Sequence, residues 1–133
     1  CGKGNVTDAH IKGYSQSEFI TDMGSVYACA DFAVARAGSN SAFELIINKV
    51  PTLFIPLENK STRGDQVKNA EYFQKRGLCR LLHQRDLTPD KLNSEISELV
   101  ADSKLRRTLE DNNLKCGNDQ IIAEIERAAI NAK

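Results

Sequence analysis

The sequence lacks the features of a membrane-spanning, secreted or nucleic-acid-binding protein. No apolar run approaches the roughly 18 residues that a membrane-spanning helix needs. The N-terminus is polar and glycine-rich, so we expect no signal peptide. Eighteen basic and eighteen acidic residues cancel, which leaves no electrostatic argument for nucleic acid or an anionic membrane. With 41% hydrophobic and 27% charged residues, the 133-residue chain has the composition of one ordinary globular domain.

Residues for metal or redox chemistry are equally scarce. The four cysteines form no CxxC pair and match no zinc-binding spacing: Cys1, Cys29, Cys79 and Cys116. We expect free thiols in a reducing cytoplasm, with Cys29 and Cys79 buried as small hydrophobic side chains. His10 and His83 have no partner cluster in the sequence, and there is no cluster of metal-binding carboxylates, so we expect no metal. No G-x-G-x-x-G follows a predicted strand, which argues against a Rossmann oxidoreductase.

The order of predicted elements indicates an α/β fold. Buried strands are predicted over 31–35, 50–56 and 78–82, with a weaker candidate over 11–19 and the tail of a strand over 1–5. Helices are predicted over 23–30, 39–48, 64–76, 89–100, 102–114 and 119–132. Capping signals accompany several of these helices, namely Thr21 or Asp22, Gly77, and Thr88 followed by Pro89. Strands that alternate with helices favour right-handed βαβ units and a parallel sheet.

A polar turn follows the first strong strand, over residues 36–44. A helix that starts beyond the carboxyl end of a strand is a common ligand site in open α/β sheets. Its free N–H groups and dipole favour an anion such as a phosphate, and Glu44 could accept hydrogen bonds from hydroxyls of the same ligand. Ser41 and Glu44 also fit a capping box, in which both side chains satisfy the helix start. Local pattern leaves both interpretations open.

A second polar segment, residues 58–66, follows the proline-flanked strand and is predicted at the same edge of the sheet. Asp65 and Gln66 would open the next helix, and a carboxylate beside an amide suits the adjacent hydroxyls of a sugar. Alternatively, Asp65 only favours the positive end of the helix dipole, and Lys60 and Arg63 are solvated loop charges.

Together these segments resemble the carboxyl-terminal half of the MurG family, most closely of Gram-positive type. The matching residues are Phe19-Ile20-Thr21-Asp22-Met23, Ala30-Asp31, Arg36-Ala37-Gly38-Ser39 with Glu44, Val50-Pro51 through Pro56, and Ser61-Thr62-Arg63-Gly64-Asp65-Gln66 followed by Asn69-Ala70. The resemblance implies a Rossmann-like parallel sheet flanked by helices, as the carboxyl-terminal half of a GT-B glycosyltransferase. It implies inverting transfer of N-acetylglucosamine from UDP-N-acetylglucosamine to lipid I, forming lipid II in peptidoglycan synthesis.

The resemblance also implies a set of donor-binding residues. Backbone atoms near Ile20 would meet the uracil, and Gly38, Ser39, Asn40 and Ser41 would approach the diphosphate and ribose. Glu44 would accept from the ribose hydroxyls, while Asp65 and Gln66 would hold the N-acetylglucosamine hydroxyls. Asn40 and Ser41 differ from the Leu-Thr pair of some relatives.

Because the chain starts at Cys1 without an initiator methionine, we expect it to be a fragment of a longer protein. The resemblance implies that residues 1–133 form a single, truncated donor domain, inactive alone. The resemblance implies that lipid I binding, the catalytic base and peripheral contact with the inner face of the membrane belong to a separate amino-terminal domain. No catalytic residue or metal ligand is expected here. The rival hypotheses are a soluble subunit of a dolichol-linked N-acetylglucosaminyltransferase and a noncatalytic nucleotide-sugar or protein-interaction module.

Overall fold

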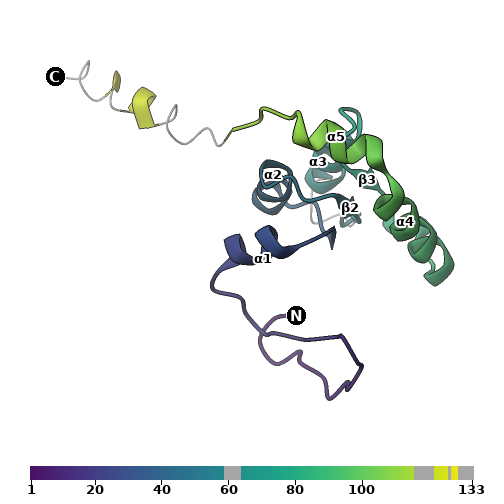
Figure 1. The fold of residues 1–133 in the computed structure, drawn as a ribbon. Coiled ribbons are helices and arrows are strands. Elements are labelled where there is room, and N and C mark those ends of the chain that lie inside the picture. The colour runs from purple at the N-terminus through teal and green to yellow at the C-terminus, as the bar shows by residue number, and fades with distance from the viewer. Residues whose placement is uncertain (59–63, 116–121, 126, 129–133) are drawn as a thin grey trace. The chain divides into compact units, whose positions relative to one another are not determined.

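A computed structural model describes residues 1–58, 64–115, 122–125 and 127–128 (Figure 1). The chain divides into two compact units, Cys1–Ala30 and Asp31–Lys133, and each is described by itself.

The first unit consists of an irregular segment, residues 1–22, and helix α1 (Met23–Cys29). Asp22 is the N-cap of α1, and its carboxylate accepts from the Ser25 N–H at 3.1 Å, which confirms one of the two predicted caps. The strand segments predicted over 1–5 and 11–19 are wrong, since residues 1–22 contain no strand. Three glycines there have positive φ angles, which interrupt extended backbone: Gly2, Gly4 and Gly13. Cys29 is exposed, so its predicted burial is wrong as well.

The second unit contains a three-stranded parallel sheet, in the order β1-β2-β3, among the described residues. Its strands are β1 (Ala33–Ala35), β2 (Thr52–Phe54) and β3 (Arg80–Leu81). In register, Val34 of β1 lies opposite Leu53 of β2, and Phe54 of β2 lies opposite Leu81 of β3. Residues 51–56 are all buried, as expected of the central strand of a sheet covered on both faces. The predicted α/β fold with a parallel sheet is confirmed, with strands shorter than predicted.

Helices flank this sheet. They are α2 (Ser39–Ile47), α3 (Asp65–Gln74), the short 3-10 helix η2 (Gln84–Asp86), α4 (Pro89–Ala101) and α5 (Ser103–Glu110). Helix α3 packs against α2 and β3, and α4 packs against β2. Gly77 takes a left-handed φ of 69° just after α3, as its predicted capping role requires. Thr88 caps α4 ahead of Pro89, also as predicted. The helix predicted over 119–132 falls largely outside the described residues, although 122–125 are helical.

Candidate functional site

The first predicted turn connects the end of β1 to the start of α2. Gly38 is the N-cap, with φ −60° and ψ 143°, and no side chain caps the helix start. A Cβ built on Gly38 would meet no atom within 4 Å, so no group crowds this position, and Ser39 and Asn40 beside it are exposed. The first N–H groups of a helix have no partner inside the helix. The start of α2 therefore offers uncapped N–H groups to an open surface, which is the geometry that binds anions.

The capping-box interpretation of Ser41 and Glu44, one of the two left open by the sequence, is wrong. Helix α2 begins at Ser39, so Ser41 already lies inside the first turn and cannot be the N-cap. Ser39, Asn40, Ser41 and Glu44 are all exposed. Glu44 lies more than one turn after the start of α2. Its side chain is therefore exposed on the same helix whose first N–H groups have no side-chain cap.

The second predicted turn is the start of α3. Gly64 is its N-cap, with a left-handed φ of 72° that glycine adopts without strain. Asp65 is the first helical residue and is exposed. The side-chain carbonyl of Gln66 accepts from the Leu57 N–H at 3.0 Å, which fixes the amide at the end of the segment after β2. Lys60 and Arg63, the predicted loop charges, lie outside the described residues.

The structure brings these two turns together at the carboxyl edge of the sheet. The Asn69 side chain on α3 donates from Nδ2 to the carbonyl of Ala37 at 3.1 Å, directly before Gly38. Arg36 donates from Nη1 to the Ile55 carbonyl and to Oε1 of Gln84, each at 2.9 Å. Arg36 therefore joins the ends of β1 and β2 to the η2 turn after β3. These positioning contacts were missed from the sequence because their partners are 19 to 48 residues apart.

Beside the start of α3 lies a cavity of about 610 Å³. Its lining residues are Glu58, Gly64, Val67, Lys68, Glu71, His83 and Arg85. Nδ1 of His83 and Oε1 of Glu58 are hydrogen-bonded to each other, and both side chains are largely buried, at 26% and 20% exposure. The hydrogen bond with His83 is the main cause that lowers the pKa of Glu58 from its usual value. The wall of this cavity therefore includes a part-buried, hydrogen-bonded Glu58–His83 pair.

Ile20, the remaining predicted site residue, belongs to the other unit and is 40% exposed there. Its contact with the uracil stays a prediction.

Among the described residues, no group of three or more His, Cys, Asp or Glu side chains could hold a metal ion. In the part of the chain that the structure describes, no helix is both long enough and apolar enough to cross a membrane.

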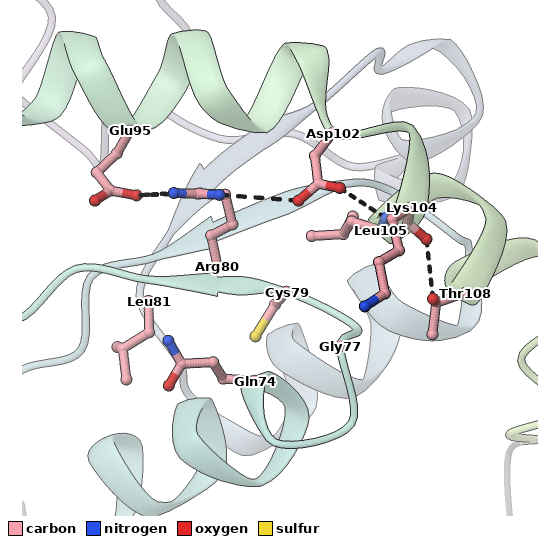
Figure 2. A pocket seen from close by; sticks show the side chains of 10 residues that line it. All are labelled: Gln74, Gly77, Cys79, Arg80, Leu81, Glu95, Asp102, Lys104, Leu105 and Thr108. Carbon is pink, nitrogen blue, oxygen red and sulfur yellow. Dashed lines mark hydrogen bonds and ion pairs between the residues drawn. The ribbon is translucent and has the colours of Figure 1, made fainter.

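A second cavity, of about 360 Å³, lies at the opposite edge of the sheet, where β3 begins (Figure 2). Arg80 dominates its wall and pairs with Glu95 at 2.8 Å, with Glu98, and with Asp102 at 3.8 Å. Burial raises the pKa of Cys79 to about 12, so this cysteine stays a protonated thiol, as the predicted structural role requires. Arg80 is thus paired with three carboxylates of α4 and its C-cap, which makes this region a structural junction between β3 and α4.

We expect Glu95→Gln to destabilise the chain by about 1–2 kcal/mol at neutral pH, since it leaves the part-buried Arg80 with weaker partners. Burial alone would raise the pKa of Glu95. Hydrogen bonds and charges from Arg80 and Lys91 outweigh this effect, so the pKa of Glu95 is lowered from its usual value. A carboxylate with a lowered pKa in the folded state stabilises above the unfolded pKa, about 4.3, and loses this contribution as pH falls below it. Urea unfolding at pH 7 and near pH 3.5 should therefore show a difference that shrinks in acid; equal differences would contradict the assignment. Glu98→Gln, at a 54% exposed side chain, is the control with a smaller effect.

The fold and these turns define a class, the parallel α/β domains that bind ligands at uncapped helix starts beyond the strand ends. Residues 1–125 match the model of the glycosyltransferase family 28 C-terminal domain. The chain therefore belongs to that family, as the resemblance indicated.

Curated relatives agree with this family. The chain is 36% identical over 127 residues to the UDP-N-acetylglucosamine--N-acetylmuramyl-(pentapeptide) pyrophosphoryl-undecaprenol N-acetylglucosamine transferase of Oceanobacillus iheyensis, covering 94% of the chain and 35% of the relative. It is 34% identical over 133 residues to the transferase of the same name from Clostridium novyi, covering 96% and 37%. The chain thus spans little more than a third of the length of these relatives.

Solved structures show the same fold. MurG of Acinetobacter baumannii aligns with a TM-score of 0.68 at 23% identity, covering 83% of this chain and 32% of that one. The glycosyltransferase VinC, solved in complex with dTDP, aligns with a TM-score of 0.59 at 26% identity, covering 71% and 22%.

Proposed function

We propose that residues 1–133 form the donor-binding part of an N-acetylglucosaminyltransferase that moves N-acetylglucosamine from UDP-N-acetylglucosamine to lipid I. The observation that carries this proposal is the uncapped start of α2 at Gly38, tied through Asn69 to the helix that presents Asp65 and Gln66. The names of the relatives support the same donor and acceptor. These relatives are bacterial transferases, so we do not favour the dolichol-linked subunit or the noncatalytic module.

The proposed roles follow from the chemistry of each group. The N–H groups at the start of α2 would face the diphosphate, and Glu44 would accept from the ribose hydroxyls. Asp65 and Gln66 would hold the sugar, and Ile20 would meet the uracil. When the acceptor 4-hydroxyl displaces UDP at the anomeric carbon, negative charge grows on the diphosphate, and fixed N–H donors stabilise that charge. This arrangement supplies leaving-group stabilisation from the protein, and we propose that it needs no metal.

The proposal covers the donor only. We assign the lipid I acceptor and the general base to parts of the protein other than residues 1–133, which would be inactive by themselves. The complete enzyme would then work in the cytoplasm, as a peripheral protein on the inner face of the cell membrane.

Calorimetric titration with UDP-N-acetylglucosamine and with UDP tests this proposal. We expect both to bind, and Glu44→Ala to weaken both by at least about tenfold, since a charge-assisted hydrogen bond contributes about 1.5–3 kcal/mol. The fold should be unaffected, because Glu44 is exposed and alanine favours a helix. Glu110→Ala, at an exposed glutamate of α5, is the matched control and should bind like the parent chain. If neither ligand binds this chain or the full-length protein, the donor assignment is wrong.

A further inference from the structure

The η2 turn after β3 is tied to both halves of the candidate site. On one side, Gln84 accepts from Arg36 at 2.9 Å, two residues before Gly38. On the other side, His83 is hydrogen-bonded to Glu58, which adjoins Leu57, and the N–H of Leu57 holds Gln66 at 3.0 Å. Gln84 therefore contacts the segment before α2, and His83, the N-cap of η2, contacts the segment that holds the start of α3.

The Glu58–His83 tie differs from an ordinary surface ion pair. Both side chains are about three-quarters buried, whereas an exposed pair is screened by water and contributes little. Two basic side chains line the same cavity without joining this hydrogen bond. Lys68 on α3 is exposed, and Arg85 pairs with Asp86 at 3.6 Å. Removing either Glu58 or His83 would therefore leave its partner part-buried without its bonded neighbour, and the segment carrying Leu57 would lose a fixed point.

We propose that Glu58 and His83 are positioning residues for the sugar half of the donor site, while Gln84 positions the nucleotide half through Arg36. The Glu58–His83 pair holds Leu57, Leu57 holds the Gln66 amide, and Gln66 faces the sugar hydroxyls in the function proposed above, on which this inference rests. Neither residue touches the donor. Glu58 and His83 keep the start of α3 in one geometry before the donor binds. Sugar binding then avoids the entropic cost of ordering this segment.

This division of roles predicts different binding signatures. In Glu58→Ala and His83→Ala, we expect affinity for UDP-N-acetylglucosamine to fall about five- to twentyfold while affinity for UDP falls less than about twofold. In Gln84→Ala, the two affinities should fall by the same factor. A general loss of stability would weaken both ligands equally, so for Glu58 and His83 the ratio of the two dissociation constants separates positioning from a merely structural role.

The pair itself is tested by a double-mutant cycle and by rescue. The double variant Glu58→Ala/His83→Ala should bind no worse than either single variant, because each single change already breaks the tie. Exchanging the partners, in Glu58→His/His83→Glu, should restore part of the sugar preference. Additive losses in the cycle, or an unchanged ratio of dissociation constants in the single variants, would overturn the proposal.

A measurement without ligand keeps this inference separate from the proposed function. We expect hydrogen exchange at the Leu57 amide to accelerate about tenfold in Glu58→Ala, with the amides of α4 and α5 unchanged. If the parent chain binds neither nucleotide, the donor function fails but this exchange experiment still decides whether the pair holds Leu57. An unchanged exchange rate at Leu57 overturns the positioning role regardless of the binding results.

Discussion

Gly38→Asp is expected to make the chain slightly more stable and to abolish most of its affinity for UDP. Gly38 has an extended conformation that any residue adopts, and its Cβ position is empty to 4 Å. Aspartate is a better N-cap than glycine by a few tenths of a kcal/mol, and its charge suits the helix dipole. The same carboxylate would occupy the N–H groups of α2 and repel a phosphate, a like-charge contact that costs several kcal/mol. We therefore expect at least a ~100-fold loss in UDP affinity.

Gly38→Asn is the matched control for this prediction. It has nearly the same shape and the same capping ability as aspartate but no charge. Blocking the N–H groups alone should lower the affinity for UDP by about tenfold. The remaining difference in affinity between the two variants then measures the repulsion between the Asp carboxylate and the negative charge of UDP. Thermal unfolding and calorimetry on both proteins give the two readouts. Equal UDP affinities for the Asp and Asn variants would show that no anion binds at the start of α2.

The architecture of the second unit was predictable because its signals are local and agree with one another. The run from Val50 to Pro56 is apolar and bracketed by prolines, and residues 51–56 are buried in the central strand. Thr88 before Pro89 marks a helix start through side-chain and φ preferences that do not depend on the rest of the fold. Strands that alternate with helices then leave few topologies other than a parallel sheet.

The errors occurred where local pattern competes with surroundings. Ser41 and Glu44 have capping-box spacing, which would start the helix at residue 42, yet α2 starts at Ser39, as in the predicted range 39–48, with Gly38 in the extended geometry of an N-cap. Residues 11–19 contain apolar side chains, at Ile11, Tyr14 and Phe19, that alternate only in part. A strand also needs a partner, and this segment is instead held by isolated contacts such as the Thr7 N–H to Oε1 of Gln16 at 3.1 Å. Burial of Cys29 likewise depended on neighbours that its sequence does not specify.

For the site, sequence predicted which turns face one edge of the sheet but not how they are held there. The register of parallel strands brings the residues after β1 and β2 to the same edge, so Gly38 and Asp65 could be grouped in advance. The ties among them, through Arg36, Asn69 and the Glu58–His83 pair, join side chains to distant partners with no motif. Only tertiary structure defines such contacts.

Phe73→Ala is expected to have the largest effect on stability of any prediction made for this chain. Phe73 is 0% exposed, and its ring packs edge to face against Phe43 and Tyr72, each with ring centroids 5.1 Å away. Removing a buried phenylalanine costs about 3–5 kcal/mol, through lost burial and the cavity left behind. Since domains of this size have about 5–15 kcal/mol in total, the variant should be near its folding limit. Urea unfolding of the parent and variant measures the difference.

Two controls separate this packing effect from the loss of an aromatic contact alone. Phe43→Ala removes one edge-to-face pair at a side chain that is 43% exposed, so it should cost only about 0.5–1.5 kcal/mol. Phe73→Leu keeps most of the volume and should cost less than about 1.5 kcal/mol. Because Phe73 anchors the helix that presents Asp65 and Gln66, bound donor should also raise the apparent stability of Phe73→Ala, by about 2.7 kcal/mol at a hundred times the dissociation constant. An unfolding midpoint that UDP-N-acetylglucosamine raises in the parent chain but not in a still-folded Phe73→Ala would mean that α3 has lost its place in the donor site.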